Sequence, residues 1–161
     1  MESNLPVTVL EYYRPIATYA CDVWVLKETT KKKLMVVERK VLRKIFGPTK
    51  ERDGTWRIKT NYQLDGLIRY MNVINHVKAQ QLSWFRHLNR MQEKRMEKKM
   101  YKWKLMSTQP QGRPKNRWED DIRCHLKKLK IKNWINCIQG RNKWKSYIER
   151  AETLEDLNCS T

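Results

Sequence analysis

Three consecutive acids, Glu119-Asp120-Asp121, are the residues whose type and spacing could most directly support metal chemistry. Paired carboxylates hold Mg²⁺ in enzymes that cleave or form phosphodiester bonds. A two-metal site needs further carboxylates from elsewhere, and the other acids of this chain are scattered, mostly among Lys and Arg. Acids in the first turns of a helix also complement its positive end, and these can pair with Arg117 and Arg123. We therefore expect them to stabilise a helix, and we predict no catalytic residue and no metal site.

Gly112-Arg113-Pro114 is the most specific short motif, and it has the form of the core of an AT-hook. In such an arm Gly permits close approach to the groove wall, Pro keeps the backbone extended, and Arg enters the narrow minor groove of DNA. An ordinary linker between two helices can contain the same three residues. Because Arg113, Lys115 and Arg117 lie within five residues, we expect this segment to contact phosphates rather than to read sequence.

The cysteines and histidines do not have the spacing of a zinc site. There is no Cys-x₂-Cys pair among Cys21, Cys124, Cys137 and Cys159. Cys124 and His125 are adjacent, so on a helix their side chains point about 100° apart. We expect no bound zinc and reduced thiols, as in the nucleus or cytoplasm. The chain has no Ser-His-Asp set, P-loop or Gly-rich dinucleotide loop, so no cofactor and no small-molecule substrate is expected.

The charge of the chain indicates a polyanionic partner. Its 161 residues contain 35 Lys and Arg against 17 Asp and Glu, a formal charge of +18. The excess lies in three consecutive blocks, 31–60, 61–110 and 111–150, which carry +8, +7 and +8 between slightly acidic ends. Such an excess repels itself unless a polyanion binds it. Nucleic acid is the first candidate and an acidic membrane surface the second, and a basic protein with no such partner is the plain alternative.

The composition excludes several classes of protein. No apolar run exceeds a few residues, so no membrane span is expected. The N-terminus lacks a basic region followed by an apolar one, so we expect an intracellular protein that is not secreted. Five Gly and five Pro are too few for a turn-rich β fold, and 40% hydrophobic residues are enough to build a core.

Hydrophobic periodicity predicts an all-α fold with several amphipathic helices. One helix begins at Thr29 or Thr30 and ends before Gly47-Pro48, with an apolar side formed by Leu34, Val37, Val41 and Ile45. Residues 49–59 are expected to form a loop that turns at Asp53-Gly54. Further helices are expected over Val9–Leu26, Asn61–Met91 and Gln92–Leu105, and, beyond a Pro/Gly break near residue 110, over Trp118–Leu129, Trp134–Ile138 and Trp144–Ala151.

Basic side chains on the outer faces of these helices are candidate phosphate ligands, and two tryptophans in basic, less periodic surroundings are candidate stacking residues. The candidate nucleic-acid-binding residues are Lys32, Arg39, Lys40, Arg43, Lys44, Trp56, Arg57, Arg90, Trp103, Arg113, Lys115 and Arg117. The tryptophans on the apolar stripes, Trp84, Trp118 and Trp144, are expected in the core instead.

A series of short motifs follows in order along the chain. They are Tyr13-Arg-Pro-Ile16, Tyr19 with Trp24, Glu38-Arg39-Lys-Val-Leu-Arg43, Phe46-Gly-Pro48, Trp56-Arg57, Asn61-Tyr-Gln-Leu64, Leu82-Ser-Trp84 with His87 and Arg90-Met91, Gly112-Arg-Pro114, Arg117-Trp118-Glu-Asp-Asp121, Trp134, and Arg141 with Trp144. This series resembles the C-terminal part of the endonuclease–reverse transcriptase polyprotein of non-LTR retrotransposons. The resemblance extends from about Leu10 to Ala151. Three positions depart from the pattern, since the family has a small residue at Arg86, an acid at Gly140 and Gly at Ala20.

The resemblance implies a thumb that grips the template–primer duplex and a basic region that holds element RNA and target DNA. It divides the chain into a thumb-like helical region (1–106), a basic Gly-Arg-Pro linker (107–117), a C-terminal helical region (118–154) and a tail (155–161). The polymerase palm with its Tyr-x-Asp-Asp turn and the endonuclease are not matched. The chain therefore looks like a fragment or truncated reading frame of a retroelement, and Mg²⁺ belongs only to a full-length polymerase.

The favoured hypothesis is a helical module that binds RNA, DNA or an RNA–DNA duplex and is not catalytic alone. It has no membrane and no small-molecule partner. Two alternatives remain open at this point. One is a host-recruited, AT-hook-like DNA-binding protein that uses the Gly-Arg-Pro arm. The other is a metal-dependent nuclease that uses Asp120 and Asp121.

Overall fold

The computed structural model describes residues 13–67, 72–103 and 117–153, and these are mostly helical, which confirms the all-α prediction. Residues 13–17 are helical and precede a short 3₁₀ helix, η1 (Cys21–Val23). The remaining elements are α2 (Glu28–Phe46), β1 (Thr49–Lys50), β2 (Trp56–Arg57), α3 (Asn61–Leu67), α4 (Val73–Arg90), α5 (Met96–Lys102), α6 (Trp118–Lys128), α7 (Trp134–Gln139) and α8 (Arg141–Thr153). No helix within these ranges is long and apolar enough to cross a membrane.

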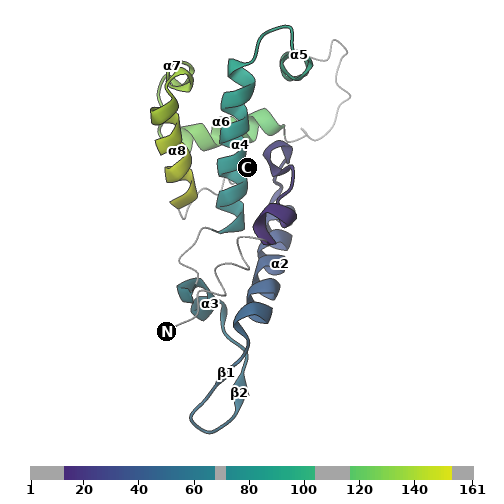
Figure 1. Ribbon diagram of the computed structural model, residues 1–161, viewed down its shortest axis with the longest axis vertical. Helices are drawn as coiled ribbons and strands as arrows, with labels where there is room; N and C mark the ends of the chain where they lie inside the picture. Colours follow the sequence, from purple (N-terminus) through teal and green to yellow (C-terminus); the bar gives the residue numbers. More distant parts are fainter. Residues whose placement is uncertain (1–12, 68–71, 104–116, 154–161) are drawn as a thin grey trace.

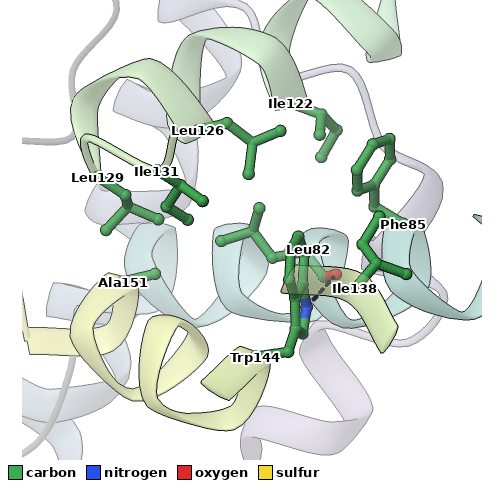
Figure 2. Packing of buried hydrophobic residues seen from close by; sticks show 9 residues of the cluster. All are labelled: Leu82, Phe85, Ile122, Leu126, Leu129, Ile131, Ile138, Trp144 and Ala151. Carbon is green, nitrogen blue, oxygen red and sulfur yellow. Dashed lines mark hydrogen bonds between the residues drawn. The ribbon is translucent and has the colours of Figure 1, made fainter. Parts of the chain in front are cut away.

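Helix α4 is the centre of the fold, and α6, α7 and α8 pack against it, with α8 alongside α4 as far as its first turn, where the Asn75 side chain donates to the Glu152 carbonyl (Figure 1). Its Leu82 and Phe85 are buried against Ile122 and Leu126 of α6. Trp144 of α8 is buried in the same cluster, and its indole Nε1 donates a hydrogen bond to the Leu82 carbonyl at 3.1 Å (Figure 2). The predicted regions 1–106 and 118–154 therefore share one hydrophobic core.

The first half of α4, with Ile74 and Val77, packs against Cys21 of η1 and against Leu34 and Met35 of α2. Polar contacts fix the same junction: Gln81 Nε2 donates to the Trp24 carbonyl at 2.7 Å, and the Glu38 carboxylate accepts from the Val73 amide at 3.1 Å. Asn72 caps the start of α4, since its side chain accepts from the Ile74 amide at 2.9 Å. This junction holds α2 at a fixed position relative to the central core.

Helix α2 leads away from the central core and carries the antiparallel β1–β2 hairpin beyond its C-terminal end (Figure 1). Gly47 ends the helix with a φ of 61°, a conformation that favours Gly. Leu42 and Leu64 pack α3 against α2 in a small separate cluster. Thr60 and Gln63 form a capping box at the start of α3, because each side chain accepts from the other residue's amide. Thr60 is thus the N-cap of α3.

Several predicted boundaries are wrong. The Val9–Leu26 helix is broken, because residues 18–20 form a turn and Ala20 has a left-handed φ of 54°; residues 9–12 lie outside the described part. The Asn61–Met91 segment holds two helices, with 68–71 outside the described residues. The predicted Gln92–Leu105 helix begins only at Met96. Residues 49–59 contain the short hairpin rather than a plain loop.

The apolar stripe predicted for α2 is rotated in the structure. Leu42, which the stripe omitted, is buried, whereas Val37 is 48% exposed. Glu38 explains the rotation, since it faces inward to meet the Val73 amide and lies 3.8 Å from the guanidinium of Arg14. The predicted bounds of α2, α6, α7 and α8 agree with the structure to within a few residues.

Candidate nucleic-acid interface

The outer side of α2 presents four exposed lysines, Lys32, Lys33, Lys40 and Lys44, which we call the α2 basic face. None of them takes part in an ion pair among the described residues. At 1.5 Å per residue, the face is about 18 Å long from Lys32 to Lys44. That length covers about five base steps along one strand of a duplex. The face can therefore contact several phosphates of one duplex.

Arg39 and Arg43, also predicted as phosphate ligands, have structural partners instead. The Arg39 guanidinium lies 3.7 Å from the Asp65 carboxylate, and Arg43 Nη2 donates to Asn61 Oδ1 at 2.5 Å. Both side chains are half-buried. They tie α3 to α2, so the structure separates them from the exposed lysines on the same helix.

The β1–β2 hairpin, which follows the C-terminal end of α2, carries an exposed aromatic ring. Trp56 is 67% exposed, and the Lys50 ammonium lies 5.9 Å from its ring centroid. Lys59 Nζ donates to Gly47 O and Thr49 Oγ1, which joins the base of the hairpin to the end of α2. Arg57 is paired with Glu51 at 2.5 Å. Trp56 is thus free to stack on a base, while Arg57 is engaged within the hairpin.

The remaining predicted residues lie away from this surface. Arg90 is the last residue of α4, and Trp103, 64% exposed, follows the end of α5. Figure 1 shows these two helix ends at the opposite end of the molecule from the hairpin. Arg117 is exposed at the start of α6. Arg113 and Lys115 lie outside the described residues. The predicted residues therefore do not form one continuous site.

A groove beside the second half of α4, which we call the α4 groove, was missed by the sequence analysis apart from Arg90. It has a volume of about 880 Å³ and is lined by Asp22, Gln80, Ser83, Trp84, Arg86, His87, Arg90, Met91, Gln92 and Arg95. Trp84 was expected in the core, but it is only half-buried and packs against His87, with ring centroids 5.3 Å apart. The signal in the sequence was the spacing of Trp84 to His87 and of Arg86 to Arg90, which places each pair on one helix face.

The acids at the start of α6 are engaged in structural contacts. Glu119 accepts from Arg123 Nη2 at 2.6 Å, as predicted, and from the Tyr101 hydroxyl at 3.4 Å. Burial raises the pKa of Asp121, whose carboxylate also accepts a hydrogen bond from the Leu26 backbone. Within the described residues, no group of three or more His, Cys, Asp or Glu side chains could hold a metal ion.

The Cys and His residues near α6 are structural as well. Cys21 and Cys137 are free thiols, but Cys124 is disulfide-bonded, so the prediction of reduced thiols is wrong at that position. His125 is 4% exposed, and its Nδ1 has no hydrogen-bond partner among the described residues. Burial, with Lys78, Lys31 and Lys128 nearby, lowers the pKa of His125 to about 3. The imidazole is therefore neutral across the physiological range.

Comparison with models of known protein families, with curated proteins and with solved structures finds no match for this chain.

Proposed function

We propose that this chain is a helical nucleic-acid-binding module with no catalytic activity of its own. It would correspond to the post-palm part of a non-LTR retrotransposon reverse transcriptase, which the motif series resembles. Its ligands would be a template–primer duplex or element RNA, and its compartment the nucleus or the cytoplasm. No cofactor and no small-molecule substrate belong to the proposal.

The observation that carries the proposal is the α2 basic face, followed in the chain by a hairpin with an exposed tryptophan. The lysines of this face lack ion pairs within the described part of the chain, although the same helix pairs Arg39 with Asp65. Unpaired cations at helical spacing on a rigid element contact phosphates at little cost in conformational entropy beyond their own side chains. Trp56 adds a ring that can stack on any unpaired base. The combination supports affinity for nucleic acid without sequence choice.

Two of the three acids at the start of α6 already have partners within the protein, which argues against the nuclease alternative. Glu119 is paired with Arg123, and Asp121 is half-buried beside the Leu26 backbone, which leaves Asp120 as the exposed member of the group. One exposed carboxylate does not provide the ligand set of a two-metal site. The AT-hook alternative rests on the Gly112-Arg-Pro114 segment, which lies outside the described residues.

A filter-binding titration tests the proposal. The full chain is titrated against a mixed-sequence DNA duplex, an RNA–DNA hybrid and a single-stranded RNA between 50 and 200 mM salt. With about six phosphate contacts, the affinity should fall roughly a thousandfold over that range. Comparable affinity for AT-rich and GC-rich duplexes is expected. Affinity that does not change with salt, or Mg²⁺-dependent cleavage of any of these ligands, would contradict it.

A further inference from the structure

The α4 groove concentrates positive charge on a surface separate from the α2 basic face. Three arginines, Arg86, Arg90 and Arg95, line it, and Asp22 is its one acidic lining residue among those described. Arg90 and Arg95 are exposed and form no ion pair within the described part of the chain. Like charges gathered in a concave site repel one another unless an anion lies between them.

Arg86 adds a partly buried guanidinium to this groove. Its Nε donates to the Ile138 carbonyl at 3.1 Å, which fixes the side chain against α7. Its Nη2 is buried and has no hydrogen-bond partner among the described residues. A buried donor without a partner is costly, so such groups are rare in folded proteins. Burial lowers the pKa of Arg86, and the positive charges of Arg90 and Arg141 lower it further.

The aromatic pair gives the groove a second chemistry. Trp84 lies four residues before Leu88 on α4 but is not part of the buried clusters of the described core. Instead its ring lines the groove and contacts the exposed His87 at a tilt of 40°. A base that has left a duplex can stack on such a ring, and a base held within a duplex cannot.

We propose that the α4 groove binds single-stranded nucleic acid, with phosphates held by Arg90 and Arg95 and a base stacked on Trp84. This inference rests on the proposed function and adds to it a second surface with a different ligand. The α2 basic face holds the phosphates of a duplex, to which the Trp56 ring adds no stacking contact, and the α4 groove takes an unpaired strand. Arg86 supports the site from α4 by adding positive charge behind the phosphate contacts.

The test compares two variants that carry the same change in charge. One is Arg90→Gln with Arg95→Gln in the groove, and the control is Lys127→Gln with Lys132→Gln, two exposed lysines in no ion pair among the described residues. Fluorescence anisotropy measures the affinity of each full-length variant for a labelled 12-nucleotide single strand and for a blunt duplex. The groove variant should lose at least tenfold more single-strand affinity than the control, with equal effects on duplex.

A third variant, Trp84→Leu, tests the stacking contact separately. It should weaken binding of the single strand roughly tenfold and leave binding of an abasic strand of the same length unchanged. Equal losses of single-strand affinity in the groove and control variants would overturn the inference. It would also be overturned if the groove bound inorganic phosphate or a mononucleotide but the groove variant kept the single-strand affinity of the wild type. If wild-type protein binds duplex but these variants do not differ, the inference fails alone. If it binds neither ligand, the proposed function fails with it.

Discussion

His125 should make the fold sensitive to acid. Its imidazole is buried in α6, its Nδ1 lacks a hydrogen-bond partner among the described residues, and the nearby charges of Lys78, Lys31 and Lys128 oppose a further positive charge. The folded protein therefore keeps this group neutral down to a pKa of about 3, whereas the ordinary value is 6.5. Below pH 6.5 the His125 imidazole is protonated in the unfolded chain but stays neutral in the folded protein. Stability is thus lost as the pH falls from 6.5 towards 3.

The size of this effect follows from the difference in pKa. Each unit is worth about 1.4 kcal/mol, so the complete loss is on the order of 5 kcal/mol. At pH 4.5, about 3 kcal/mol of that loss should already be present. Small domains have a total stability of about 5–15 kcal/mol, so the loss is large enough to measure by denaturation.

Urea unfolding followed by circular dichroism at pH 7.5 and pH 4.5 measures it. His125→Gln removes the titrating group, and His87→Gln serves as the control because His87 is exposed. Between the two pH values, wild type and His87→Gln should each lose about 3 kcal/mol more than His125→Gln does. Protonation of carboxylates is common to all three proteins and cancels. The same loss of stability in all three would refute the reasoning.

Three further predictions follow from single positions. Ala20 has a φ of 54°, a conformation that costs about 1 kcal/mol for a residue with a Cβ. Ala20→Gly should therefore raise the free energy of unfolding by about that amount. An unchanged urea midpoint would show that the turn is not strained. Phe85 contacts four aromatic rings in the core, and Phe85→Ala should cost about 3–5 kcal/mol in the same assay, unlike a change at exposed Ser83. Trp56→Ala should leave the urea midpoint unchanged but weaken binding of single strands by about 1–3 kcal/mol, and a loss of stability would show that Trp56 has a structural role.

The helices could be predicted from the sequence where periodicity and end signals agree. Gly47-Pro48 marks the end of α2, and the 118–129 stripe with acids in its first turn marks α6. The predicted Val9–Leu26 helix is too long because a left-handed turn interrupts it at Ala20. Alanine is a good helix former, so its presence in the sequence does not indicate a turn.

The candidate site was harder to predict because charge and exposure are separate properties. Arg39 and Lys40 are neighbours of the same charge, yet Arg39 pairs with Asp65 of α3 and Lys40 is exposed. The partner of Arg39 lies 26 residues away, so only the packing of α3 against α2 reveals it. The α4 groove depends on tertiary structure in the same way, because two of its lining residues, Asp22 and Arg95, lie before and after α4 in the sequence.

The central claim is that the α2 basic face binds the phosphates of a nucleic acid. The most direct test is the dependence of duplex affinity on salt for Lys32→Gln/Lys40→Gln/Lys44→Gln, compared with Lys127→Gln/Lys132→Gln/Lys143→Gln, which makes the same charge change at exposed lysines elsewhere. The slope of log affinity against log salt should flatten by about three units in the first variant and by less than about one in the second. Equal flattening in both variants, or none in either, would contradict the account.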